Sequence, residues 1–375
     1  MAPENASEVA SFFTELAVLP SPPGEERQVA DRVKRYLRDL ALEVDEDNAG
    51  TKVGSTAGNI LARAEPTAAG VPLFFCAHMD TVPPEGPIEP TMDDGVIRNA
   101  AGTILGADNK AAVAVMLEAT RRVVGEGRPH AGVELLFTPK EEVGLLGAAA
   151  FDATRLEARV GYVYDQASPI GEVILGAPHA HAMQVRFHGR AAHSGMYPEE
   201  GRSAIAAAAR AIADLRLGRL DDETTANVGV IHGGTAANIV PEWCTFTAEA
   251  RSRDEGKLAD LVQEMLDAIT FAAELGDCVV ETELKKSYRG YAFRKDDLPI
   301  RLACDALQRT GFEPTFAFSG GAADANVFNE RGLACVNLAN GMANIHTPEE
   351  EIAIRDLDAM VDVTLALVDA ARESA

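Results

Sequence analysis

The chain has 375 residues, of which 47% are apolar and 25% are charged, and its formal net charge at pH 7 is −24. This composition indicates a globular protein, and the length suits two domains better than one. The acidic balance disfavours binding to nucleic acid or to an anionic membrane surface, whereas it favours cationic ligands and divalent metal ions.

The cysteine pattern and the apolar runs bear on the cellular compartment of the protein and on the type of metal site that it can form. The five cysteines are scattered and form no C-x-x-C pair, so neither a disulfide framework nor a zinc–thiolate site is predicted. The first 20 residues lack the basic segment and long apolar core of a secretory signal, and no later apolar run reaches the roughly 18 residues of a membrane span. We therefore expect a cytoplasmic protein.

The N-terminal region is predicted to fold into two helices and a short strand. Apolar residues at helical spacing follow Ser7, a suitable N-cap, and predict a helix over residues 7–19 that ends before Pro20. A second amphipathic helix is predicted over residues 25–40, and residues 59–63 are predicted to form a strand. These elements precede the first segment that contains candidate site residues.

An apolar run at residues 73–77 has the length of a buried strand and ends in His78-Met79-Asp80. Ligands of open α/β sheets bind outside the C-terminal ends of the strands, and side chains two residues apart on a strand lean to the same side. This arrangement suits a metal-ligating histidine whose imidazole is oriented by a neighbouring carboxylate. Alternatively, the two side chains only cap a turn.

Several prolines after Asp80 predict an irregular stretch as far as residue 104. A helix is then predicted over residues 111–124, which places Asp108 at the junction between a loop and a helix, where its carboxylate can point outward. An aspartate at such a junction is often only an N-cap.

Two further apolar strands also end in acidic residues. Residues 132–137 predict a strand that is followed by Glu141 and Glu142, and residues 160–164 predict one that is followed by Asp165. Adjacent carboxylates repel each other unless a cation is shared between them, so Glu141 and Glu142 suggest a bound cation with one ligand and one base. The alternative is the exposed start of a helix.

Three strand ends and Asp108 together form a pattern that separate capping residues explain poorly. Imidazole and carboxylate ligands without thiolates suit zinc, with manganese or cobalt as further candidates. Five ligands suffice for two metal ions if one carboxylate bridges them. His346, on an irregular segment before a helix that is predicted over residues 354–371, offers the fifth ligand.

The middle of the chain predicts a separate α/β unit. Strands are expected over residues 182–189, 226–232 and 245–250, and helices over residues 203–215 and 258–274. This alternation implies a small α/β sandwich in which helices cover one face of a sheet.

Motifs spread in order over nearly the whole chain carry a family resemblance. They are HMDT, GADNKAA, TPKEEVGLLGA, YDQ, AAHSG, EARSRD, SGGAADANVF and NIHTPEE. Together they resemble the dizinc aminoacylase, carboxypeptidase and tripeptidase family of metallopeptidases, and most of all its peptidase T-like members. The resemblance implies a mixed-sheet, phosphorylase/hydrolase-like α/β catalytic domain at residues 1–177 and 291–375, with a small α/β sandwich lid domain inserted at residues 178–290. It also allows a homodimer through the lid domain.

The resemblance implies a role for each residue of the expected metal site. His78 and Asp165 are implied as ligands of one metal ion. Glu142 and His346 are implied as ligands of the second ion, with Asp108 as the bridge between the two. Two divalent ions, zinc in the first place, are therefore the expected cofactors.

Two acids beside the ligands are implied to take part in catalysis. Asp80 is expected to support His78, and Glu141 to be the general base that takes a proton from the metal-bridging water and returns it to the leaving amine. The family often has a small or acidic residue where this chain has Lys140. A cation at that position could lower the basicity of Glu141.

Three residues of the expected lid are implied to contact the substrate. His193 matches a hydrogen-bond donor to the oxyanion of the tetrahedral intermediate. Asn238 and Arg251 match positions that hold carbonyl or carboxylate groups of the substrate. For these two, a structural hydrogen bond or salt bridge is an equal alternative.

The expected function is that of a metal-dependent exopeptidase that acts on small peptides, and in particular of an aminopeptidase for tripeptides. An N-acyl amino acid deacylase or a carboxypeptidase of the same family remains an alternative. A catalytically inactive metal- or peptide-binding relative would be expected to lack a ligand or the base. A dimetal phosphoesterase is disfavoured because the sequence shows no cluster of arginines or lysines that could hold a phosphate.

Overall fold

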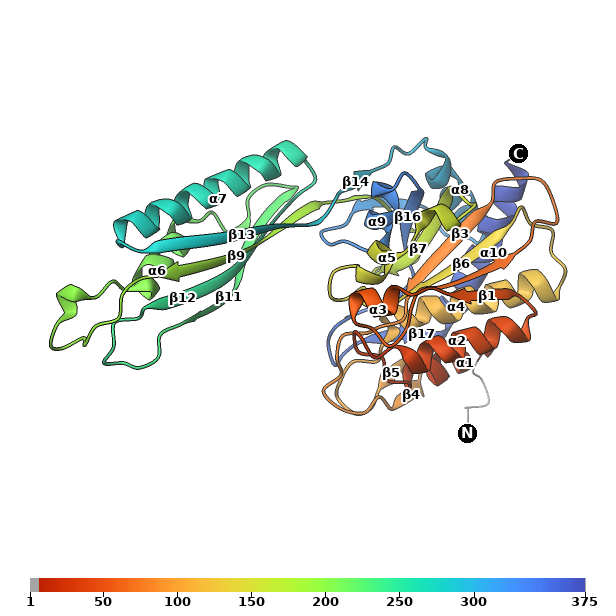
Figure 1. The fold of residues 1–375 in the computed structure, drawn as a ribbon. Coiled ribbons are helices and arrows are strands. Elements are labelled where there is room, and N and C mark those ends of the chain that lie inside the picture. Colours follow the sequence, from red (N-terminus) through yellow and green to blue (C-terminus); the bar gives the residue numbers. More distant parts are fainter. Residues whose placement is uncertain (1–6, 375) are drawn as a thin grey trace. The chain divides into compact units, whose positions relative to one another are not determined.

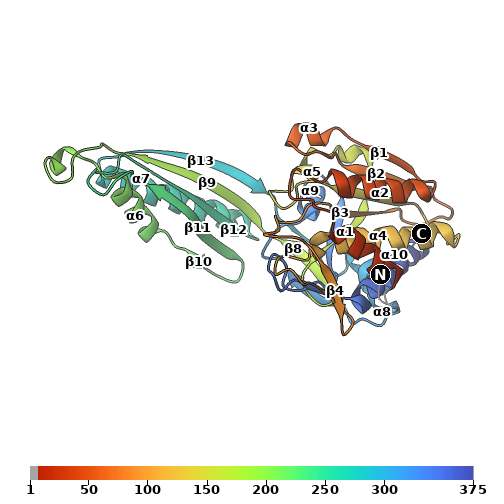
Figure 2. The ribbon, with the colours of Figure 1, turned by 90° about the horizontal axis from the view of Figure 1, so that it is seen from below.

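The computed structural model describes residues 7–374, and the chain divides into two compact units. Unit 1 combines Met1–Gly176 with Ala292–Ala375, and unit 2 is the continuous segment Ala177–Tyr291. Figures 1 and 2 show the elements of each unit from two directions. Within residues 7–374, no helix is both long and apolar enough to cross a lipid bilayer.

Unit 1 is built on a mixed sheet in which strands run in the order β1-β2-β6-β3-β7-β16-β8-β14, where β14 spans Tyr291–Ala292, and β15 also pairs with β8. The neighbours β6, β3, β7 and β16 are parallel, whereas β1 and β2 are antiparallel to their neighbours, and β8 runs antiparallel to β16 and parallel to β15. The strands are β1 (Glu43–Glu46), β2 (Ile60–Ala64), β3 (Leu73–His78), β6 (Val133–Thr138), β7 (Val160–Gln166), β8 (Glu172–Ala177), β15 (Thr315–Phe318) and β16 (Ala334–Ala339). The predicted α/β class with a mixed sheet is confirmed.

Helices cover both faces of this sheet, so its parallel strands are buried on both sides, as such strands require. They are α1 (Glu8–Ala17), α2 (Arg27–Asp39), α3 (Ala49–Val53), α4 (Ala107–Gly125), α5 (Leu146–Ala150), α8 (Leu298–Arg309), α9 (Asp324–Glu330) and α10 (Ile354–Glu373), with a 3₁₀ turn at Ala153–Arg155. On β3, Phe75 belongs to the core that contains the apolar residues of α4, whereas the ring of Phe74 meets Phe328 of α9 edge-on at 5.3 Å between centroids.

The proline-rich stretch after Asp80 contains a hairpin that the sequence analysis did not predict. β4 (Pro90–Asp93) and β5 (Val96–Asn99) pair antiparallel, and β17 (Glu351–Ala353) adds a third strand. Asp94 and Gly95 both adopt positive φ, as the two central residues of a type I′ turn do. The Asp-Gly pair was the available signal, and the expectation of an irregular segment up to residue 104 was wrong.

Unit 2 is an antiparallel sheet with the strand order β10-β11-β12-β9-β13. Its strands are β9 (His179–His188), β10 (Gly218–Arg219), β11 (Thr224–Gly233), β12 (Trp243–Ser252) and β13 (Val279–Tyr288); a 3₁₀ turn spans Pro198–Glu200, and β14 (Tyr291–Ala292) follows at the end of the unit. Alternate residues of β9 (Met183, Val185 and Phe187) pack with the buried residues of α6 (Ala204–Asp214) and α7 (Glu255–Leu275). Both helices therefore cover the same face of the sheet (Figure 1).

The packing of the Phe74 ring over β7 depends on a glycine. Gly161 of β7 is the register partner of Phe74, and a Cβ atom at Gly161 would overlap the Phe74 ring. We expect Gly161→Ala to lower the free energy of unfolding by about 1 to 3 kcal/mol, because the ring cannot move without disturbing its packing on α9. Thermal unfolding measures the effect.

The matched control for this change is Gly125→Ala at the exposed end of α4, where an added Cβ would meet nothing within 4 Å. Its expected effect is neutral or a stabilisation of up to about 1 kcal/mol, because alanine favours helix. Equal unfolding temperatures for the two variants would contradict the packing argument.

Candidate dimetal centre

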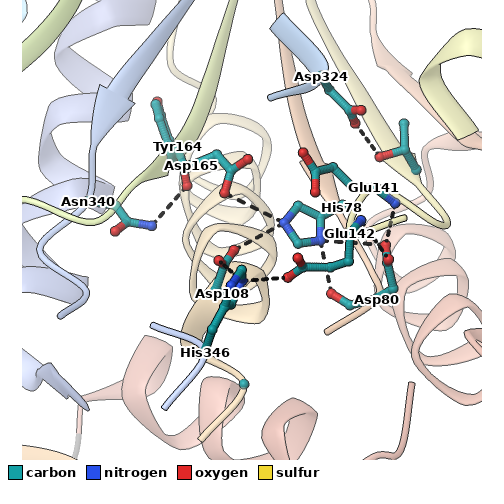
Figure 3. A network of polar contacts seen from close by, with 12 residues as sticks. His78, Asp80, Asp108, Glu141, Glu142, Tyr164, Asp165, Asp324, Asn340 and His346 are labelled. Atoms are coloured by element: carbon teal, nitrogen blue, oxygen red, sulfur yellow. Dashed lines mark hydrogen bonds and ion pairs between the residues drawn. The ribbon is translucent and has the colours of Figure 1, made fainter. Parts of the chain in front are cut away.

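Seven of the predicted site residues come together at the C-terminal ends of the parallel strands of unit 1 (Figure 3). They are His78 at the end of β3, Asp80 just after it, Asp108 at the start of α4, Glu141 and Glu142 in the loop after β6, Asp165 in β7, and His346 in the loop between β16 and β17. Parallel pairing places the ends of β3, β6 and β7 at one edge of the sheet, which is where ligands bind in such folds.

Asp108 lies between the two imidazoles. Its Oδ1 is 3.1 Å from Nε2 of His78, and its Oδ2 is 3.2 Å from Nε2 of His346. Asp165 Oδ1 lies 3.6 Å from the same nitrogen of His78, and Glu142 Oε1 lies 3.1 Å from Nε2 of His346. One oxygen of Asp108 therefore faces each histidine–carboxylate pair, as a bridging ligand would.

The local backbone explains why Asp108 can point into this cluster. α4 begins at Ala107, but Asp108 and Asn109 have non-helical φ and ψ. The carboxylate thus leaves the helix at its start instead of capping it, and regular helix continues from Lys110 onward. The N-cap alternative for Asp108 is not what the structure shows.

The chemistry of the donor atoms fits metal ions. Three sets of residues each place one potential ligand atom within 4.8 Å of the others: His78 with Asp108 and Asp165, Asp108 with Glu142 and His346, and His78 with Glu141 and Glu142. Nitrogen and carboxylate oxygen donors without sulfur are the set that zinc, manganese or cobalt accept. The chain's own residues can therefore hold divalent cations here.

The protonation equilibria show how crowded the acids are. Burial and the nearby charge of Asp108 raise the pKa of Asp165 to about 8. Burial also raises the pKa of Glu141 well above its ordinary value, although the charge of His78 opposes the shift. Hydrogen bonds to Asp108 and Glu142 raise the pKa of His346 to about 10. Negative charge is thus concentrated where a cation would relieve it.

Asp80 organises the loop that carries the two glutamates. Its Oδ1 accepts a hydrogen bond from the backbone N–H of Glu141 (3.0 Å), and its Oδ2 accepts one from that of Glu142 (3.1 Å). Nδ1 of His78 lies 2.9 Å from the Asp80 carbonyl oxygen and 3.6 Å from its carboxylate. A protonated Nδ1 therefore donates a hydrogen bond to the carbonyl oxygen of Asp80. This leaves Nε2 free for a metal ion.

Lys140 directs its charge away from Glu141. The Lys140 Nζ donates to the carbonyl oxygen of Val53 at 2.9 Å, and its backbone N–H donates to the buried Glu26 at 3.2 Å. The groups that chiefly shift the pKa of Glu141 are burial, His78 and neighbouring carboxylates. Lys140 therefore secures the loop to another part of unit 1.

Sequence reasoning missed several buried polar residues beneath the cluster. Asn337 of β16 binds the main chain of Asp165 twice: it accepts from the N–H at 2.9 Å and donates to the carbonyl at 3.1 Å. Asn340 donates to the carbonyl of Tyr164 at 2.9 Å (Figure 3). Asn337 inside the otherwise apolar run of β16, and Asn340 just after it, were the available signal.

Asp324, at the start of α9, is another buried acid that received no individual role in the sequence analysis. Its Oδ2 accepts a hydrogen bond from Thr138 Oγ1 at 2.5 Å, and burial raises its pKa to about 6. It belonged to the motif SGGAADANVF, which was noted as a whole.

The three remaining candidates lie in unit 2. His193 and Asn238 are exposed and sit on adjoining loops, because the N–H of Ser194 donates to the Asn238 carbonyl at 3.1 Å. Nδ1 of His193 accepts from the N–H groups of Gly195 and Met196, both at 3.2 Å. Arg251 on β12 is half-buried and donates to Glu249 at 2.9 Å.

Comparisons with known proteins bear on this site. Residues 176–276 match the peptidase dimerisation domain, and residues 59–172 match peptidase family M28. The uncharacterized protein YqjE of Bacillus subtilis is 35% identical over 98% of this chain and 99% of its own length. The crystal structure of aminopeptidase PepT from Bacillus cereus has 37% identity and a TM-score of 0.90, and that of a tripeptidase from Staphylococcus aureus has 33% identity and a TM-score of 0.94; each match covers 98% of this chain and 99% of the other.

Fold, ligand cluster and these similarities define a metallopeptidase, a hydrolase of peptide bonds. Within this class, the chain belongs to the peptidase T-like family.

Proposed function

We propose that this chain is a metal-dependent aminopeptidase that releases the N-terminal residue of tripeptides. The observation that carries the proposal is the position of Asp108 between two imidazole–carboxylate pairs, with Glu141 beside them. The names of the two similar crystal structures, an aminopeptidase and a tripeptidase, support the substrate class.

The proposed cofactors are two divalent ions, zinc in the first place. His78 and Asp165 would hold one, Glu142 and His346 the other, and Asp108 would contribute an oxygen to each. Such ions, when bound, polarise a scissile carbonyl and lower the pKa of a bound water.

Glu141 is the proposed general base. Asp80 fixes its backbone N–H, so the carboxylate is held next to the ligands rather than free in solvent. Its raised proton affinity suits a group that accepts a proton from water and then delivers it to the leaving amine.

Unit 2 is proposed to supply substrate contacts and an interface between subunits. His193 would donate a hydrogen bond to the oxyanion, and Asn238 and Arg251 would bind carbonyl or carboxylate groups of the peptide. The match of residues 176–276 to a peptidase dimerisation domain supports a homodimer formed through this unit.

The substrate class is tested by mass spectrometry of the products from a tripeptide of three different residues, its N-acetylated form and the corresponding dipeptide. We expect the free tripeptide to yield its first residue and the remaining dipeptide. Loss of the α-ammonium group should slow cleavage of the acetylated peptide by about 100-fold or more, because a site that binds a free amine is left with unpaired polar groups by an acetylated one.

A protein sample with Glu141→Gln, prepared in the same way, controls for contaminating peptidases. If the acetylated peptide is cleaved at least as fast as the free peptide, the aminopeptidase assignment is wrong and a deacylase is indicated. Release of the C-terminal residue would replace it by a carboxypeptidase.

A further inference from the structure

Glu350 is a buried acid that the proposed chemistry does not use. Its side chain is 1% exposed, although it lies in the loop that follows His346. Three backbone N–H groups point at its carboxylate: Leu105 and Gly106 donate to Oε2 at 2.7 and 2.8 Å, and Asp108 donates to Oε1 at 2.9 Å. Both oxygens are thus occupied by donors from one short turn.

The turn is shaped for this carboxylate. Gly106 has φ +78, a left-handed conformation that glycine adopts without strain, and a Cβ there would come within 3.3 Å of Thr81. Backbone N–H groups that converge in this way form an anion-binding concavity. Hydrogen bonds to a charged acceptor are about twice as strong as neutral ones, so this contact fixes the main chain just before the bridging carboxylate.

The other end of Glu350 is fixed to the loop that carries His346. The N–H of Glu350 donates to the carbonyl of Thr347 at 3.1 Å, and the neighbouring Glu351 exchanges two backbone hydrogen bonds with Ala343, at 3.0 and 3.1 Å. His346 itself has φ +62, so its loop has a defined conformation that these bonds hold. Glu350 therefore joins two segments that are far apart in the sequence.

The 105–108 turn and the 343–351 loop are also in contact through the proposed ligands Asp108 and His346. Asp108 Oδ2 and His346 Nε2 lie 3.2 Å apart, and they belong to the same potential metal-binding set as Glu142. A shift of the 105–108 turn relative to the 343–351 loop would separate these two atoms. The imidazole of His346 is 44% exposed and gains little support from packing, so its position depends on the main chain.

We propose that Glu350 is a positioning residue that holds Asp108 and His346 in the arrangement needed to bind the metal ion they share. This inference rests on the proposed dimetal function and assigns a role to a residue outside the ligand set. Partners of metal ligands typically change metal affinity or activity by about 10- to 100-fold when they are replaced.

Glu350→Gln tests the proposal because it keeps the shape but turns an NH₂ group toward backbone N–H donors. The matched control is Glu349→Gln, since Glu349 is the adjacent acid, is exposed and carries the same charge. Zinc ion alone, without peptide, is titrated into metal-free protein in competition with a chromogenic chelator. We expect Glu350→Gln to weaken the binding of at least one of the two zinc ions by about 10- to 100-fold, and Glu349→Gln to match the parent chain.

Zinc affinities of Glu350→Gln within about twofold of the parent chain would overturn the proposal. If Glu350→Gln does not fold, Glu350→Asp, which keeps the charge but withdraws it by one methylene, carries the test: weakened zinc binding supports the role and unchanged binding refutes it. Because no peptide is present, the measured zinc affinity does not depend on whether the protein cleaves tripeptides. A parent chain that binds zinc tightly but cleaves no tripeptide would refute only the peptidase specificity.

Discussion

Glu141→Gln is expected to lower kcat by about 10²- to 10⁴-fold while the metal content of the protein stays unchanged. Gln has the same shape but cannot accept a proton from water. The backbone N–H of Glu141 remains bound to Asp80, so the loop should keep its conformation. Turnover of a tripeptide and metal analysis of the same sample give the two readouts.

The neighbouring acid provides the matched comparison. Glu142 Oε1 contacts His346 at 3.1 Å, so Glu142→Gln is expected to lose metal as well as turnover. Glu141 also has an oxygen within reach of His78 and Glu142, which gives the geometry a second interpretation in which Glu141 is the ligand. Metal loss from Glu141→Gln together with metal retention in Glu142→Gln would show that the two roles are reversed.

Removal of metal is expected to abolish activity altogether. Inductively coupled plasma mass spectrometry of native protein should find up to two divalent transition metal ions per chain. Exhaustive chelation should stop tripeptide cleavage, and zinc, cobalt or manganese should restore it, because these ions accept imidazole ligands. The metal-free protein should also unfold at a lower temperature, since ions bound only by the native state stabilise it.

Magnesium at the same concentration is the control for this experiment. It prefers oxygen ligands and water, so it should restore little activity to a site with two imidazoles. Full activity after exhaustive chelation would contradict the metal-dependent mechanism.

The central strands could be predicted because each satisfies a strong local rule. The run before His78 is apolar at every position and the run before Thr138 is apolar except at Glu134, as is typical of strands buried on both faces, and the structure finds both strands fully buried. The β4–β5 hairpin was missed because the prolines before it outweighed a single Asp-Gly signal. The edge strand β13 was also missed, since its alternation includes many exposed polar residues.

The candidate ligands could be proposed from sequence because several strand-like runs are each followed by an imidazole or a carboxylate, a combination that separate capping residues explain poorly, and because the family resemblance implies a role for each. Glu350 and Asn337 could not be found in this way. Their partners lie 245 and 172 positions away in the chain, and nothing local distinguishes Glu350 from the exposed Glu349 beside it. Only tertiary structure shows which of two adjacent glutamates is buried against a turn.

The interrupted chain path of unit 1 has a consequence for synthesis on the ribosome. β16 lies between β7 and β8, yet it is made only after all of unit 2 has emerged. Until then, β7 and β8 lack their shared neighbour, and His346 is not yet translated. A nascent chain therefore lacks the proposed ligand His346, and with it the complete proposed metal site, until the segment that follows unit 2 has been made. A truncated chain that ends at residue 291 should accordingly show no tripeptidase activity.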